Sequence, residues 1–473
     1  MKKFIKYLIM ALLTFSSFGL IYYTYKLNVL NTKPFILLSM IIVLIWFFLM
    51  FKLMRKKTRK IPKIIFGIIS LFLIFVYSVG ARYINSTIDY AKKITNIKYE
   101  TINYKVLTLK SSEYNELLDL KNKNIGFMST DKYLDKSTEE LAKSLDFDDK
   151  TYEEVGTLIG SLYEGKIDAL VINDSYLELL EENNVAFTKE DKLIYSYSIK
   201  SFGSKDKDKI DVTKDPFIVY ISGSDSRGTV SDTARSDVNI VAVINPEKRK
   251  VLLVSIPRDY YVQLHGTTGV KDKLTHAGVY GIDMSITTIE DLLDIDINYY
   301  TKVSFNTVVK LVDTIDGIDI YSDTAFTGYS EATKEKCNYI VGTQHVNGEC
   351  ALRFARERKI YMSGDRHRGQ NQQAVITAII NKMANPKYLI RYDKILKNTE
   401  GTFETNISYD EITNLAKYEL TDLKSFSVES ISLDGEGDMQ PTYSMGDINL
   451  YVMQPNMDTV NAAKTKIAEY MEK

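Results

Sequence analysis

The first 84 residues contain three predominantly apolar segments, which run over 4–25, 34–51 and 61–84. Each segment is long enough to cross a hydrocarbon core of about 30 Å as a helix. Aromatic residues, and no small-residue cleavage site, follow the first segment at Tyr22 to Lys26. We therefore expect a retained membrane helix there and not a cleaved signal peptide, and 1–84 as a whole is predicted to form three transmembrane helices.

The two loops between these segments differ in charge. Residues 52–60 are dense in Lys and Arg, whereas the first loop holds only Lys26 and Lys33. The positive-inside rule puts the basic loop and the N-terminus in the cytoplasm, and everything after Arg82 outside. A basic run can also bind nucleic acid, but its place between two apolar segments favours a topology signal.

Residues 99–200 have the pattern of a small α/β unit. Strands are predicted at Ile102–Leu109, Asn124–Met128 and Lys166–Ile172, and a helix is predicted at Tyr152–Tyr163. Because no glycine-rich fingerprint accompanies them, we interpret this unit as an accessory domain that serves as a spacer or for interactions. The charged run at 201–210 is the predicted linker.

Residues 211–473 alternate buried strands with amphipathic helices. The predicted elements are strands at Pro216–Ile221, Val238–Ile244, Lys250–Ser255 and Asn298–Val303, and helices at Ser285–Leu293 and Phe305–Ile315. This alternation predicts an α/β domain with a central, mostly parallel sheet flanked by helices. In such sheets functional sites gather beyond the strand ends.

Composition adds few constraints. The 473 residues are too many for one average domain, and the 60 basic and 61 acidic residues nearly balance, so nothing global favours nucleic-acid binding. The two cysteines, Cys337 and Cys350, lie close together in the sequence. In the cytosol they would be two thiols, but outside the cell they can form a disulfide that stabilises by about 3 kcal/mol.

A first charged cluster connects two of the predicted strands. Asp225 and Arg227 follow the strand at 216–221, and Arg235 and Asp237 precede the next strand. Carboxylates beside a buried sheet can hold a hard divalent cation, and guanidinium groups bind phosphate oxygens as forked donors. The cluster therefore predicts a metal and phosphate site. The alternative is a solvated loop with local ion pairs.

A second charged cluster lies further along the chain. Arg258 follows a strand, Arg356 and Arg358 would point the same way if extended, and Arg368 precedes Gln372. We expect Gln372 to open a helix that runs to Met383. Several guanidinium groups near a helix N-terminus make an anion site. The alternative is a basic surface paired with neighbouring carboxylates.

Two other motifs are set aside. The frame Gly223 to Gly228 resembles a P-loop, but Thr229 and Val230 replace its required Lys and Ser or Thr. No H-E-x-x-H motif occurs, and we interpret His276 and His345 as structural, hydrogen-bonded groups.

Taken together, the charged blocks resemble the LytR-CpsA-Psr family of cell-envelope phosphotransferases. The blocks that carry the resemblance are Gly223–Arg227, Arg235–Asp237, Ser255–Asp259, Gln344–Gly348 with Ala351 and Leu352, Arg356–Arg358, and Gly364–Arg368 with Gln372 and Gln373. They occur in the family's order. Three membrane helices and an accessory domain before the catalytic domain resemble the capsule-assembly branch.

The resemblance implies transfer of a glycopolymer, such as capsular polysaccharide, from undecaprenyl pyrophosphate to a peptidoglycan hydroxyl. Asp225 and Asp237 would hold Mg²⁺, with Mn²⁺ as the alternative cation. The pyrophosphate would be gripped by Arg235, Arg258, Arg356, Arg358, Arg368 and Gln372, with Arg227 as a further candidate. The implied partners are the polyprenyl-pyrophosphate-linked polymer, peptidoglycan and the membrane, with no nucleic acid.

Two other hypotheses remain open at this point. One is a non-catalytic polyprenyl-pyrophosphate receptor that regulates the envelope. The other is a DNA-binding transcriptional regulator, which the predicted exterior location of 211–473 disfavours.

Overall fold

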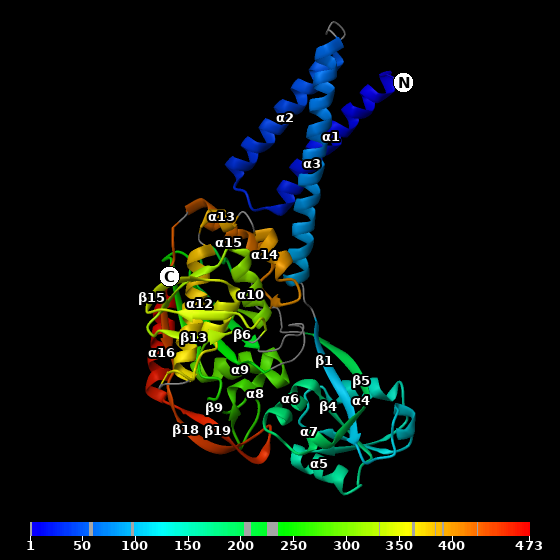
Figure 1. Cartoon of the computed structure of the whole chain (residues 1–473), viewed down its shortest axis with the longest axis vertical. Coiled ribbons are helices and arrows are strands. Elements are labelled where there is room, and N and C mark those ends of the chain that lie inside the picture. Colours follow the sequence, from blue (N-terminus) through cyan, green and yellow to red (C-terminus); the bar gives the residue numbers. More distant parts are fainter. Residues whose placement is uncertain are drawn as a thin grey trace.

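The computed structural model shows three parts: a group of long helices at the N-terminus, a large α/β domain, and a smaller α/β domain at the far end (Figure 1). The structure describes residues 2–55, 60–95, 99–202, 210–224, 235–330, 332–361, 365–383, 385–389, 392–422 and 424–473.

Each of the three predicted apolar segments forms one long helix. These helices are α1 (Lys2–Leu27), α2 (Thr32–Met54) and α3 (Lys60–Thr95). All three are long and apolar enough to cross a membrane. Helix α3 continues well beyond its predicted end, and its last turns reach the large domain (Figure 1).

Direct contacts join the helices to the large domain. Ile88 and Ala91 of α3 are buried in a small apolar cluster with Tyr409, whose hydroxyl donates to the Leu27 carbonyl at 3.0 Å. Lys417 also donates to the Asn28 side chain at 2.6 Å. The short loop between α1 and α2 therefore lies at the same end of the helices as the large domain.

The smaller domain, which corresponds to the predicted accessory unit, is built on a five-stranded mixed sheet in the order β3-β2-β4-β1-β5. Its elements are β1 (Tyr99–Leu109), η1 (Leu117–Leu120), β2 (Asn124–Met128), α4 (Leu134–Ala142), β3 (Asp148–Tyr152), α5 (Val155–Tyr163), β4 (Ala169–Asn173), α6 (Asp174–Glu182), α7 (Phe187–Glu190) and β5 (Asp191–Phe202). The buried strand β4 and the amphipathic α5 match the predicted periodicity.

The large domain is organised around a six-stranded sheet in the order β16-β11-β6-β7-β8-β17. Its strands are β16 (Phe403–Thr405), β11 (Tyr299–Ser304), β6 (Phe217–Ser224), β7 (Val238–Asn245), β8 (Lys250–Ile256) and β17 (Ser427–Ser432). Alternate residues of each strand point to opposite faces. Thus Ile218 and Tyr220 pack against α9 (Ile282–Leu293) and α16 (Met457–Met471), while Phe217 and Val219 face α12 (Asp365–Met383) and α15 (Tyr409–Asp422).

The predicted α/β class with helices on both faces is confirmed, but the sheet is mixed and not mostly parallel. Only β11–β6 and β8–β17 pair in parallel, whereas β16–β11, β6–β7 and β7–β8 are antiparallel. The physical reason lies in the connections. Residues 246–249 are too few for a crossover between β7 and β8, so these strands must form a hairpin.

The remaining elements surround this sheet. They are β9 (Tyr261–Val262), β10 (Asp272–Lys273), α8 (Leu274–Ala277), η2 (Gly278–Tyr280), α10 (Phe305–Thr314), β12 (Ile318–Ser322), β13 (Phe326–Tyr329), β14 (Lys336–Tyr339), β15 (Gly342–Val346), α11 (Gly348–Ala355), α13 (Pro386–Leu389), α14 (Tyr392–Asn398), β18 (Gly435–Thr442) and β19 (Gly446–Pro455).

The two α/β domains share one hydrophobic core. The buried cluster that joins them includes Leu158, Leu179 and Phe187 of the small domain and Val279, Tyr280 and Met445 of the large domain. Fully burying each such side chain contributes roughly 1.5–3 kcal/mol. In addition, the Tyr176 hydroxyl donates to the Ser444 carbonyl across the boundary. The small domain is therefore packed firmly against the large domain, beside α8 and α9 (Figure 1).

Candidate active site

The site lies where β6 and β7 leave the central sheet. Strand β6 ends at Ser224 and β7 begins at Val238. The predicted site residues Asp225 and Arg227 lie outside the described residues. The described part of the connection starts at Arg235.

Backbone contacts fix the position of Asp237. Its N–H donates to the Gly223 carbonyl at 2.8 Å. A Cβ at Gly223 would lie 2.8 Å from Cβ of Val238, so the close approach of the two strands requires glycine there. The neighbouring Ser236 hydroxyl is buried and hydrogen bonds to Tyr220 at 2.9 Å and to Ser222 at 2.8 Å. These contacts hold the segment so that the Asp237 side chain, 10 % exposed, lines a cavity.

Arg258 reaches the same cavity from the end of β8. Its Nη1 donates to Oδ1 of Asp237 at 2.5 Å, and its Nε lies 3.7 Å from Oδ2 of Asp259. Lys273 pairs with Asp259 at 3.0 Å. The carboxylates therefore compensate the charge of a largely buried guanidinium and fix its direction.

Arg356 and Arg358 follow helix α11. The helix is capped by Asn347, whose side chain accepts from the Cys350 N–H at 3.0 Å. Arg356 is its C-cap residue and lies over the Phe305 ring, 4.4 Å from the centroid. The two arginines would point the same way only on an extended segment, and that condition is not met, because Arg356 ends helix α11. Both arginines nevertheless line the cavity.

Glu357 organises this turn. The side chain is 4 % exposed, and its Oε1 accepts from the N–H groups of Arg358 at 2.9 Å and Lys359 at 2.7 Å. Its Oε2 accepts from Arg353. Burial raises the pKa of Glu357, but the hydrogen bonds from Arg353 and the backbone outweigh it and leave the pKa below its ordinary value. Glu357 thus holds the backbone that carries the arginines.

Arg368 and Gln372 lie one turn apart on α12. This helix begins at Asp365, so the expectation that Gln372 opens it is wrong. The residues instead share one helix face through their i, i+4 spacing, and both line the cavity. His367, next to Arg368, stacks on Tyr361 with the two ring centroids 3.4 Å apart. Burial lowers the pKa of His367, although the nearby charge of Asp323 acts to raise it.

These elements enclose a cavity of about 580 Å³. Among its lining residues are six of the predicted site residues, which are Asp237, Arg258, Arg356, Arg358, Arg368 and Gln372. The lining also includes residues that were not predicted, namely Glu182, Val238, Phe305, Thr327, Gly328, Tyr329, Arg353, Glu357 and Lys359. The cavity is therefore strongly cationic and suited to a ligand with several anionic oxygens.

Arg235, the other predicted site residue that the structure describes, is not among the residues that line this cavity. Its side chain is 10 % exposed and pairs with Glu182, which also lies 3.8 Å from Nη2 of Arg258. Glu182 belongs to the small domain. Sequence periodicity offered no signal for it, since an acidic residue at the end of an amphipathic helix is ordinarily solvent-exposed.

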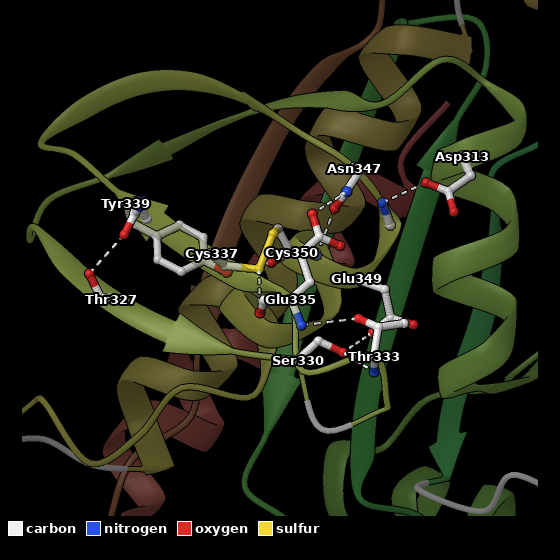
Figure 2. Close-up of a disulfide and its surroundings, with 12 residues drawn as sticks. Asp313, Thr327, Ser330, Thr333, Glu335, Cys337, Tyr339, Asn347, Glu349 and Cys350 are labelled. Carbon is white, nitrogen blue, oxygen red and sulfur yellow. Dashed lines mark hydrogen bonds between the residues drawn. A yellow bond between two sulfur atoms is a disulfide. The ribbon is translucent and has the colours of Figure 1, made fainter.

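Cys337 and Cys350 are joined by a disulfide that ties β14 to the first turn of α11 (Figure 2). Polar contacts support the same region: Asn347 donates to Glu335 at 3.0 Å and the Gly348 N–H donates to Asp313 at 2.8 Å (Figure 2). The disulfide thus fixes the start of the helix whose other end carries Arg356.

The two histidines singled out in the sequence lie outside the cavity. His276 is buried and hydrogen bonds through Nδ1 to Asp272 at 2.6 Å and to Ser444 at 2.8 Å. His345 is exposed and contacts Asp319 at 2.7 Å. Both contacts fit a structural role.

Comparison with known proteins shows the family. The LytR_cpsA_psr family profile matches residues 182–466, more than half of the chain. The chain belongs to the LytR-CpsA-Psr family. The start of the match at Glu182, inside the small domain, means that the family region includes the residue that pairs with Arg235.

Several LytR-CpsA-Psr relatives are similar over about half of this chain. The polyisoprenyl-teichoic acid–peptidoglycan teichoic acid transferase TagU of Bacillus cereus (strain AH820) is 34 % identical over 224 residues, 47 % of this chain and 70 % of TagU. TagV of Bacillus subtilis (strain 168), which bears the same kind of transferase name, is 30 % identical over 59 % of this chain and 71 % of TagV. TagT of the same strain is 32 % identical over 55 % of this chain and 78 % of TagT.

Two solved structures were also compared. The match to the crystal structure of B. subtilis TagV covers 55 % of this chain and 98 % of the TagV chain, with 30 % sequence identity and a TM-score of 0.46. A structure of TagT bound to LIIa-WTA covers 56 % of this chain and 94 % of its own, with 28 % identity and a TM-score of 0.44.

The donor set of the cavity fits a hard divalent cation. Asp237 presents a carboxylate in the cavity, and carboxylate oxygens are the ligands that Mg²⁺ prefers. The second predicted ligand, Asp225, lies outside the described residues. Within the described residues no group of three or more His, Cys, Asp or Glu side chains forms a closed metal site. Mg²⁺ in proteins commonly binds through one or two carboxylates together with substrate phosphates, so it does not require a closed set of protein ligands.

Proposed function

We propose that this protein is a membrane-anchored phosphotransferase that moves a glycopolymer from undecaprenyl pyrophosphate to a hydroxyl of peptidoglycan. The observation that carries the proposal is the single cavity that Arg258, Arg356, Arg358 and Arg368 line together with Asp237. The names of the relatives, which act on polyisoprenyl-linked teichoic acid and peptidoglycan, support the same reaction class.

The side chains of the cavity would act on the pyrophosphate by position and charge. Guanidinium forks bind phosphate oxygens in pairs and become more effective as negative charge develops in the transition state. Arg356 is held by the Phe305 ring, and Arg358 by the turn that Glu357 organises. Because these supports exist in the folded protein, the arginines need little rearrangement when the substrate enters.

The transfer step is a nucleophilic substitution at phosphorus. The acceptor hydroxyl oxygen forms a bond to the phosphorus that carries the polymer, and the bond from this phosphorus to the bridging oxygen breaks. Undecaprenyl monophosphate leaves with the electron pair, and the product is a phosphodiester. Asp237, the carboxylate among the arginines, is our candidate to accept the hydroxyl proton.

Asp237, together with Asp225, would hold the divalent cation. Mg²⁺, or Mn²⁺ in its place, would supply neutralisation of pyrophosphate charge when bound. Arg235, which is mostly buried and pairs with the cavity-lining Glu182, would orient pyrophosphate oxygens that come near it.

We further propose that α1, α2 and α3 cross the cell membrane with the N-terminus in the cytoplasm and both α/β domains outside. The basic loop at 52–60 supports this orientation. For the polymer, we retain capsular polysaccharide as the first substrate to test. Teichoic acid, which the relatives' names specify, is the second.

The proposed function is tested with the full-length chain in proteoliposomes. Labelled undecaprenyl-pyrophosphate polymer, either capsular or teichoic, is incubated with peptidoglycan and Mg²⁺, and label in the insoluble wall fraction is measured. We expect transfer by the wild type and none by Arg356→Ala. The exposed variant Lys143→Ala, far from the cavity, serves as the control. Tight binding of the carrier without any transfer of either polymer would favour the receptor hypothesis.

A further inference from the structure

The small domain places a carboxylate among the arginines of the large domain. Glu182 is the last residue of α6 and forms ion pairs with Arg235 and, at 3.8 Å, with Arg258. Its side chain is 43 % exposed, whereas that of Arg235 is 10 % exposed. The carboxylate can thus move into solvent, while the guanidinium remains inside.

The position of Glu182 is fixed by the packing of α6. The helix begins with Asn173, whose side chain accepts from the Tyr176 N–H at 2.8 Å. Tyr176, Leu179 and Leu180 are buried in the core shared by the two domains. The end of α6 is therefore held beside the cavity that Glu182 lines, and the placement of Glu182 does not depend on a surface ion pair.

The charge of Glu182 matters because of the arginines beside it. A buried guanidinium without an anion is costly. Glu182 is the carboxylate that pairs with Arg235, whereas Arg258 also pairs with Asp237 and Asp259. A carboxylate and a phosphate group are bound by the same forked donors. Glu182 and the pyrophosphate therefore compete for the same guanidinium groups.

We propose that Glu182 is an internal competitor for the pyrophosphate subsite, which helps the phosphorylated product to leave. Before the substrate binds, Glu182 neutralises Arg235 and adds negative charge beside Arg258, and it gives way when the pyrophosphate enters. The leaving monophosphate carries about −1.5 to −2 charge at pH 7, so the arginines bind it tightly. The return of Glu182 to the arginines opposes that binding and speeds release.

This inference rests on the proposed function and is tested by Glu182→Gln in the full-length protein. Titration calorimetry with inorganic pyrophosphate and with farnesyl monophosphate measures affinity, and transfer assays measure single and multiple turnover. We expect about tenfold tighter binding of both probes, an unchanged single-turnover rate, and a multiple-turnover kcat several-fold lower with a lower KM. Glu181→Gln, on the preceding residue, is the matched control.

The outcomes separate the two proposals. Equal affinity and equal turnover in the wild type and Glu182→Gln would overturn the competitor role and leave the proposed function intact. Weaker binding by Glu182→Gln would also overturn it and make Glu182 a residue that orders the arginines. If neither protein bound either probe, both proposals would fail. Thermal unfolding of both variants checks that the shared core is intact.

Discussion

Arg258 donates from Nη1 to Oδ1 of Asp237 at 2.5 Å, which joins the end of β8 to the start of β7. Both side chains are mostly buried, with 18 % and 10 % exposed. The pair therefore links the predicted metal ligand to the predicted phosphate-binding arginines, two groups that are separate in the sequence.

The first prediction concerns this pair. Asp237→Asn keeps the size of the side chain but removes its charge, so it weakens cation binding and leaves Arg258 with a poorer acceptor. We expect polymer transfer to fall by about 100-fold or more. We also expect the free energy of unfolding to fall by about 1–3 kcal/mol, because a hydrogen bond to a charged group is weakened. Transfer assays and denaturant titration measure the two effects. A wild-type rate in Asp237→Asn would contradict the assigned role.

The second prediction concerns the fork of Arg356. Arg356→Lys keeps the positive charge but loses the paired donors and the planar stacking on Phe305, 4.4 Å away. We expect affinity for pyrophosphate to fall about tenfold, which corresponds to about 1.4 kcal/mol. Phe305→Leu removes only the stacking and should give a smaller loss in the same direction. Equal affinity in Arg356→Lys and the wild type would show that charge alone suffices.

The third prediction concerns the disulfide between Cys337 and Cys350. The free energy of unfolding of the Cys337→Ser, Cys350→Ser double variant should be about 3 kcal/mol lower than that of the wild type. The reason is that the unfolded chain gains conformational entropy when the disulfide no longer closes the loop. Reducing agent should destabilise the wild type by the same amount and leave the double variant unchanged. Because the bond fixes the start of α11, we also expect slower transfer. Equal stability in oxidised and reduced wild type would contradict the prediction.

The fourth prediction concerns pH and Glu357. Its pKa in the folded protein lies below the ordinary value, so the unfolded chain binds more protons as the pH falls. Its stabilising contribution is therefore fully present above a pH of about 4.3 and is lost as the pH falls through the lower folded pKa. Glu357→Gln should lose stability at pH 6 but differ less from the wild type at pH 3. Glu436→Gln, on the exposed face of β18, is the control. A difference between the wild type and Glu357→Gln that did not change with pH would exclude this linkage.

Much of the fold follows from local periodicity. The predicted strand at Asn124–Met128 matches β2, and the predicted helix at Phe305–Ile315 matches α10 to within one residue. Both are short, strongly patterned segments with clear breakers. The mixed character of the central sheet was also readable in principle, because four residues between β7 and β8 permit only a hairpin. Alternation of strands and helices elsewhere in the domain obscured that signal.

The sequence allowed us to predict which residues form the candidate site, but not the secondary structure on which those residues lie. Arg358 and Gln372 line the cavity, although the first lies in a turn and the second inside a helix. Propensities could not reveal that Glu357 would fold back on its own backbone. Glu182 was out of reach for another reason: its partner Arg235 is distant in the sequence and belongs to another domain. The small domain nevertheless contributes Glu182 to the lining of the cavity.

The shared core has a consequence for the order of folding. Residues 99–202 leave the ribosome well before β18 and β19, yet Leu179 and Phe187 are buried together with Met445. The small domain therefore cannot close its apolar face until nearly the whole chain has been synthesised. During that interval its exposed surface is prone to aggregate or to bind chaperones. The packing that positions Glu182 therefore depends on residues that lie far apart along the chain, from Leu179 to Met445.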